Sequence, residues 1–108
     1  MSSKRKQGPV ERVLRKARGL IAKGWCKSAL MRSTPSGGHL YCAVGAVNAV
    51  ACKNAFGTGP EREPALNALR AEVPLYESLV DFNNSQETSE PVLALFDRAI
   101  ATAKERGL

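Results

Sequence analysis

The chain has 108 residues and a formal net charge of +6, and 44% of its side chains are hydrophobic while only 6% are aromatic. This length suits one domain, and an aliphatic, aromatic-poor composition favours packed helices over a β-sandwich. Its longest apolar run is shorter than the about 20 residues of a membrane span, and its charged start lacks the apolar core of a secretion signal, so a cytoplasmic protein is expected.

Charge is distributed unevenly along the chain. Residues 1–32 hold ten Lys or Arg against one Glu, whereas residues 33–108 hold six Lys or Arg against nine acidic residues. The first part therefore carries a net charge of +9 and the remainder a net charge of −3. Such a polarity favours attraction to phosphates or to an acidic partner surface.

A basic arm and a first helix open the chain. Residues 1–8 are polar and aperiodic and are predicted to form a disordered arm, followed by a single helical domain over residues 9–108. Pro9 suits the first position of a helix. The apolar positions that follow have the spacing of one helical face: Val10, Val13, Leu14, Ala17, Leu20 and Ile21.

The opposite face of this first helix is basic. At about 100° per residue, Arg12, Arg15, Lys16 and Lys23 gather away from the apolar positions. Their charges add, whereas a merely solubilising face normally mixes both signs. We therefore expect this face to meet a partner.

The first helix is followed by a predicted turn and hairpin. Gly24 is expected to end the helix in the left-handed conformation, with Trp25 folded back on Leu20. The segment STPSGG marks a tight turn between two short extended segments. A β-hairpin is predicted near residues 27–41.

Residues 41–56 are nearly all apolar and are predicted to form a central helix. An element that is apolar on every side belongs in the middle of a domain. Gly45 and Ala49, four residues apart, are expected to let another backbone approach closely.

Two shorter helices are predicted at about residues 64–73 and 75–83, separated by Pro74. The second should end left-handed at Asn83 or Asn84.

A long last helix should begin after Thr88 or Ser89 and end at Gly107. These elements together predict a mainly α fold, a small single-domain helical bundle around the central apolar helix, with one short β-hairpin.

Four stretches of the sequence carry a family resemblance. GWCKSAL, YCAVGAV, FNN and TSEPVLALFDRAI are similar to the motifs of a family of short proteins of unknown function from actinobacteria and their phages. The resemblance spans residues 10–102. Phe82 stands where the family usually has Trp, and Asn84 stands where it usually has Asp. The resemblance implies a genomic setting and no catalytic residue.

The Cys and His residues of the chain equal in number the four ligands of a zinc site: Cys26, His39, Cys42 and Cys52. However, no C-x-x-C pair is present, and on one helix Cys42 and Cys52 would lie about 15 Å apart, too far to share an ion or a disulfide. The set of Cys26, His39 and Cys42 remains geometrically possible. We expect three reduced thiols, no metal and no cofactor.

A thiol enzyme is a further hypothesis. Cys42 falls in the first turn of the predicted central helix, where the helix dipole stabilises a thiolate, and His39 is placed to act as its base. Buried Cys residues are nevertheless common in closely packed helices.

The leading hypothesis is a non-enzymatic binding protein, of phage or prophage type, that docks on a host or viral macromolecule. A protein partner is expected before DNA or RNA, and nucleic-acid binding is the main alternative. The expected contact residues are Lys4, Arg5, Lys6, Arg12, Arg15, Lys16 and Lys23.

Overall fold

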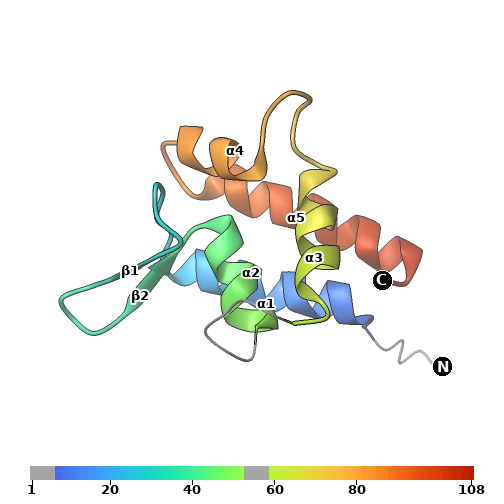
Figure 1. Cartoon of the computed structure of the whole chain (residues 1–108), viewed down its shortest axis with the longest axis horizontal. Coiled ribbons are helices and arrows are strands. Elements are labelled where there is room, and N and C mark those ends of the chain that lie inside the picture. The colour runs from blue at the N-terminus through green and yellow to red at the C-terminus, as the bar shows by residue number, and fades with distance from the viewer. Residues whose placement is uncertain (1–6, 53–58) are drawn as a thin grey trace.

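The computed structural model describes residues 7–52 and 59–108 (Figure 1). Its elements in chain order are α1 (Pro9–Lys23), β1 (Met31–Ser33), β2 (His39–Tyr41), α2 (Ala43–Ala51), α3 (Arg62–Arg70), α4 (Leu79–Ser85) and α5 (Glu90–Arg106). The predicted mainly α fold with one short hairpin is confirmed. Among the described helices, none is long and apolar enough to cross a membrane.

The core lies where α1, α2, α3 and α5 meet. The apolar face of α1 is buried against α2 and α5, as its periodicity predicts. Burial of each large core side chain stabilises the fold by about 1.5–3 kcal/mol. The largest fully buried apolar side chains are Phe96, Leu14, Ile21, Leu66, Leu69, Leu95, Val47 and Val92.

The hairpin projects from one end of the bundle (Figure 1). Strands β1 and β2 are antiparallel, with Met31 opposite Tyr41 and Ser33 opposite His39. The predicted STPSGG turn is present: the backbone amide of Gly38 donates to Thr34 Oγ1 at 2.9 Å. Both strands are short, and their side chains are exposed or only partly buried. The core is therefore supplied by the helices.

Gly24 ends α1, but the predicted left-handed conformation is wrong. Its φ of −176° and ψ of 115° are extended. The reason is a long-range pairing: the amide of Tyr41 donates to the Gly24 carbonyl at 2.9 Å, and the amide of Cys26 donates to the Tyr41 carbonyl at 3.1 Å. A Cβ at position 24 would lie 2.7 Å from the side chain of Leu40, so glycine serves close packing here.

The central helix is shorter than the predicted 41–56. Tyr41 belongs to β2, and Cys42 caps α2, its Sγ accepting the backbone N–H of Gly45 at 3.3 Å. The described part of the helix ends at Ala51. The end predicted beyond it, at positions 53–56, lies outside the described residues.

Gly45 allows a close backbone approach, as predicted. A Cβ at this position would overlap the carbonyl group of Leu30, in the segment before β1. Ala49, by contrast, is exposed. Of these two positions on α2, only Gly45 is therefore in contact with another backbone segment.

The second of the two short helices starts later than predicted. α4 begins at Leu79, because Ser78 supplies the cap: its Oγ accepts the amide of Asp81 at 3.0 Å. Residues 75–78 precede the helix as a loop. The left-handed ending predicted at Asn83 or Asn84 is also wrong, since the helix continues through Ser85.

The bounds of the last helix match the prediction, but the capping expected of Thr88 or Ser89 is not found, since Ser89 at the N-cap position makes no side-chain capping hydrogen bond. α5 follows Ser89 and ends at Gly107, whose φ of 72° is left-handed. The amide of Glu11, in the first turn of α1, donates to the carbonyl of Leu108 at 3.2 Å. The start of α1 is thereby tied to the end of α5.

Candidate functional site

The predicted basic face is found on the outward side of α1. Arg12, Lys16 and Lys23 are exposed, and at about 100° per residue they fall within about 40° of one another. They span about 16 Å along the helix axis. Gly19 lies close to the same line, and open space surrounds the position where its side chain would be. Positions 4–6, predicted to join this surface, lie outside the described residues.

Two other cations of α1 are paired within the fold. Arg15 Nε lies 2.8 Å from Glu11 Oε2, and the Glu11 side chain is only 7% exposed. Arg18 Nε lies 2.6 Å from Asp97 Oδ1 on α5. Arg15 therefore contributes less free charge to the predicted surface than its neighbours.

The three remaining cations form no ion pair with any residue that the structure describes. We call Arg12, Lys16 and Lys23 the basic line of α1. Like charges on one line reinforce each other's potential, which attracts an anionic surface and speeds its association.

The stretch between α1 and α2 is organised by Asn83, which the sequence did not single out as a site. Its side chain is 1% exposed. Its Oδ1 accepts the indole N–H of Trp25 at 2.9 Å and the backbone N–H of Ala43 at 3.1 Å. Its Nδ2 donates to the Cys26 carbonyl at 3.2 Å. One amide thus joins the Gly-Trp turn, the start of α2 and α4.

Asn84 continues this network. Its Oδ1 accepts the backbone N–H of Ser28 at 2.8 Å and the Nδ2 of Asn83 at 3.2 Å. Ser28 has a φ of 67°, a left-handed conformation that needs support from its surroundings. The oxygen of Asn84 therefore supports the backbone of the turn at Ser28.

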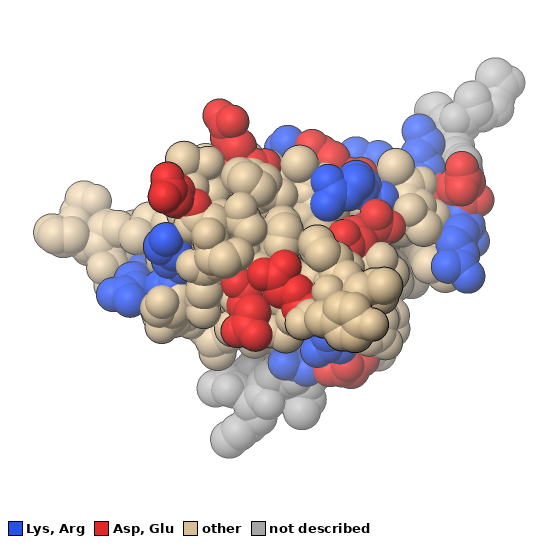
Figure 2. Space-filling model, turned by 90° about the horizontal axis from the view of Figure 1, so that it is seen from above, with Lys and Arg blue, Asp and Glu red and all other residues tan. Residues whose placement is uncertain are grey.

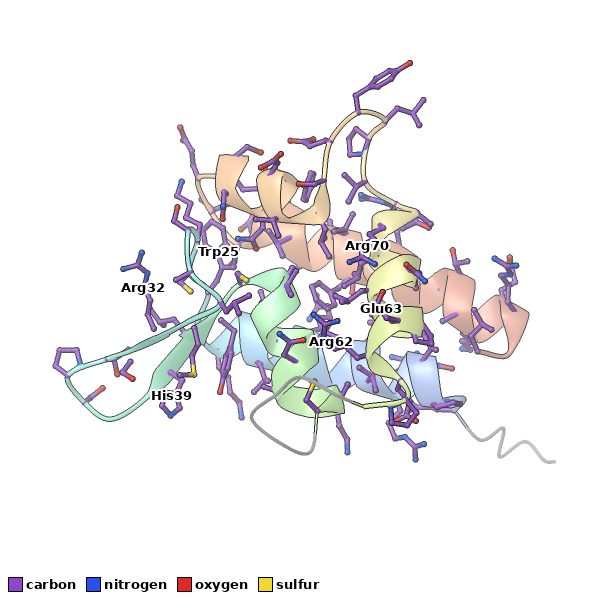
Figure 3. All side chains as sticks on the ribbon, in the orientation of Figure 1. Trp25, Arg32, His39, Arg62, Glu63 and Arg70 are labelled. Atoms are coloured by element: carbon purple, nitrogen blue, oxygen red, sulfur yellow. The ribbon has the colours of Figure 1, made fainter. Side chains whose placement is uncertain are left out.

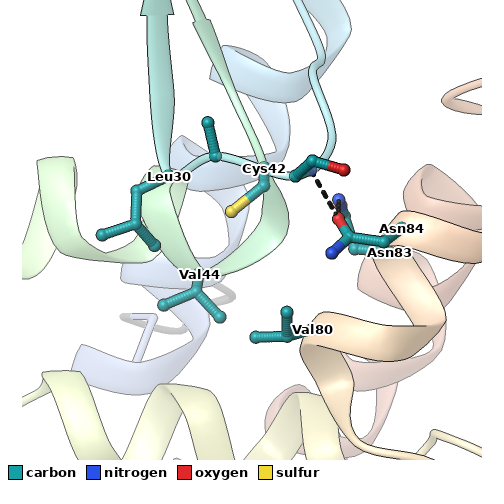
Figure 4. A pocket seen from close by; sticks show the side chains of 8 residues that line it. Leu30, Cys42, Val44, Val80, Asn83 and Asn84 are labelled. Carbon is teal, nitrogen blue, oxygen red and sulfur yellow. Dashed lines mark hydrogen bonds between the residues drawn. The ribbon is translucent and has the colours of Figure 1, made fainter.

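A pocket of about 250 Å³ lies against this network (Figure 4). Three of its polar side chains are engaged in hydrogen bonds: Asn83 and Asn84 hold backbone groups, and the Cys42 thiol accepts the Gly45 amide. In the part of the chain that is described, no buried side-chain nitrogen or oxygen lacks a partner. Apolar groups of Leu30, Val44 and Val80 form the remaining wall.

The predicted thiol–imidazole pair is not brought together. His39 is exposed at the outer edge of the hairpin, and its ring centroid lies 6.3 Å from that of Tyr41 (Figure 3). Cys42 is buried and caps α2. Over residues 7–52 and 59–108, no hydrogen bond joins His39 to Cys42.

The surroundings of Cys26 perturb the pKa of its thiol. Trp25 and Tyr41 pair in a parallel bridge, which places Cys26 beside Cys42. Burial raises the pKa of Cys26, the neighbouring Cys42 raises it further, and Arg32 opposes the shift. All three cysteines are free thiols. Within the described ranges, no group of three or more His, Cys, Asp or Glu is placed to hold a metal ion.

The fold and surface define a small helical domain with a projecting hairpin and a line of exposed cations on its first helix. The chain belongs to a family of unknown function (DUF6197), whose family model matches residues 5–102. No curated protein and no solved structure matches the chain. Family membership accords with the resemblance of the four sequence stretches and brings no activity with it.

Proposed function

We propose that this protein is a non-enzymatic binding protein that docks on an acidic surface of another protein through the basic line of α1. The observation that supports this most is the contrast on α1 itself. Arg15 and Arg18 are paired with carboxylates, whereas the cations of the basic line are exposed and pair with no carboxylate that the structure describes. Lys4, Arg5 and Lys6 precede the helix and would extend the same charge.

The shape of α1 suits such a contact. Between Lys16 and Lys23 the helix carries Gly19, where no side chain holds a partner away from the backbone. An acidic partner could approach the helix at this point while both flanking cations reach its carboxylates. Charges at such an interface act chiefly on the association rate, so binding should weaken with salt.

Nucleic acid is the alternative ligand, because the same cations would neutralise phosphates. The exposed face of α1 carries no aromatic side chain for base stacking, which disfavours single strands. The resemblance to proteins of actinobacteria and their phages makes a host or viral protein the expected partner. A thiol enzyme is the weakest alternative, given the separate surroundings of His39 and Cys42.

Affinity purification from a lysate of the native host, with and without nuclease, tests the proposal. We expect one protein to be retained after nuclease treatment and to be released by salt. Loss of every retained protein on nuclease treatment, with direct binding of the purified chain to duplex DNA, would favour the nucleic-acid alternative instead.

A further inference from the structure

The loop between α3 and α4 exposes two large apolar side chains in succession. Leu75 is 85% exposed and Tyr76 is fully exposed. The loop projects beyond both helices, at the top of Figure 1. Neither side chain contributes to the hydrophobic core. We call Leu75 and Tyr76 the apolar tip.

The backbone of the apolar tip is an unfavourable place for an aromatic residue. The amide of Glu77 donates to the Pro74 carbonyl at 3.2 Å, which closes a four-residue turn. Tyr76 occupies the third position of this turn with a φ of 71°. Turns of this kind favour Gly or Asn there, because a Cβ is strained at positive φ. The turn therefore keeps Tyr76 exposed, and burial of its side chain does not compensate for the strained backbone.

The surroundings of the tip are acidic. Residues 71–97 contain six acidic residues and no Lys or Arg. Two of the six contact an arginine: Glu72 and Asp97. The other four have no basic partner within the described chain: Glu77, Asp81, Glu87 and Glu90. Figure 2, which looks down on this side, shows acidic side chains gathered near its centre.

A pocket of matching chemistry lies between α3 and α5. It has a volume of about 260 Å³. This volume accommodates a single side chain and is smaller than that of typical cofactor sites. Arg106 stands on its lining, is exposed, and forms no ion pair with the described residues. Its apolar lining is Pro64, Ala68, Ala71, Ala103 and Leu108.

We propose that the apolar tip docks in this α3–α5 pocket of a second copy of the chain. Tyr76 fills the apolar pocket, and Glu77, next to the tip, pairs with the partner copy's Arg106. The tip follows α3 in the chain, and α3 also lines the pocket. In a dimer with a two-fold axis, the commonest symmetry of homodimers, each copy would insert its tip into the other's pocket.

This self-association involves no residue of the basic line. Its outcome is therefore independent of the function proposed above. An aromatic side chain buried in a partner's pocket is a common source of binding energy, and a desolvated ion pair beside it fixes the orientation.

Sedimentation velocity of the purified chain across a micromolar concentration series tests the proposal. We expect a reversible dimer that Tyr76→Gly weakens by about tenfold or more. Because glycine suits a positive φ, this variant should keep or raise the melting temperature, which separates a lost contact from a lost fold. A wild-type chain that stays monomeric throughout the series would overturn the proposal.

The pocket is tested with a matched pair of variants. Ala71→Arg places a long side chain in the pocket, whereas Ala101→Arg makes the same change at an exposed position of α5 outside it. Only the first should weaken the dimer. Equal effects of the two variants would contradict the assignment of the pocket.

Mixing two defective variants tests the reciprocity. Tyr76→Gly retains its pocket and Ala71→Arg retains its tip, so one of the two contacts can form between them. The mixture should associate more strongly than either variant alone. Failure to restore association by mixing would show that tip and pocket do not meet.

Discussion

The indole Nε1 of Trp25 donates a hydrogen bond to Asn83 Oδ1 at 2.9 Å, across 58 positions of the chain. This contact ties the turn after α1 to the middle of α4. The same oxygen accepts the amide of Ala43, the first residue of α2. Three elements that are distant in sequence therefore depend on one buried side chain.

Asn83→Ala should lower the free energy of unfolding by about 2–4 kcal/mol. The change leaves the N–H groups of Trp25 and Ala43 without their acceptor, and each buried unpaired group costs about 1–3 kcal/mol. Urea denaturation followed by fluorescence of the single Trp measures the effect. A loss below about 0.5 kcal/mol would mean that water replaces the amide and that the network is not a structural centre.

Asn84→Asp is the matched variant at the next position and should change stability by less than about 1 kcal/mol. A carboxylate oxygen still accepts the backbone N–H of Ser28. The same denaturation experiment reports the result. A loss as large as that of Asn83→Ala would show that the amide hydrogens of Asn84 matter and that its oxygen alone does not support the turn.

Gly45→Ala should destabilise the protein by about 1–3 kcal/mol, since an added methyl group overlaps the carbonyl of Leu30 and the backbone must shift. Gly19→Ala is its control: open space surrounds that position on α1, and alanine is the better helix former by about 0.5–1 kcal/mol. Thermal melts should therefore move in opposite directions. A melting temperature lowered equally by both changes would contradict the packing described for α2.

Stability should fall at alkaline pH in a way that depends on Cys26. Burial raises the pKa of this thiol, so the folded chain holds its proton more tightly than the unfolded chain does. The resulting stabilisation is complete below the ordinary thiol pKa of about 8.5 and is lost as pH rises toward the raised value. Cys26→Ala should therefore show a shallower decline in stability as the pH rises above about 8.5. The free energy of unfolding is measured by urea denaturation at each pH. An equally steep decline in wild type and in Cys26→Ala would contradict this prediction.

Much of the fold follows from local patterns. The periodic apolar positions of α1 and the Gly107 ending of α5 are properties of a few neighbouring residues, and both predictions are confirmed. Gly24 differs because its conformation is decided by pairing with Tyr41, which local sequence does not reveal.

The site was harder to predict. The spacing of Leu75, Leu79 and Phe82 suits a helix, yet the Ser78 cap starts α4 later and leaves Leu75 in a loop. The role of Asn83 depends on groups 40 and 58 positions away. The spacing of the basic residues predicts the cationic face of α1. Only the structure shows that Glu11 pairs with Arg15 and thereby distinguishes this neutralised cation from the basic line.

We propose that the basic line of α1 is the surface that meets an acidic partner. The test is affinity purification from nuclease-treated host lysate with three forms of the chain, followed by comparison of the proteins that each form retains. The forms are the wild type, a basic-line variant with Arg12→Glu and Lys16→Glu, and a control variant with Arg32→Glu and Arg98→Glu. The two double variants change the net charge equally, and all four positions are exposed. We predict that wild type and the control retain the same partner and that the basic-line variant does not retain it. Circular dichroism should show that the basic-line variant is folded. Retention of that partner by all three forms would show that the partner binds a surface other than the basic line.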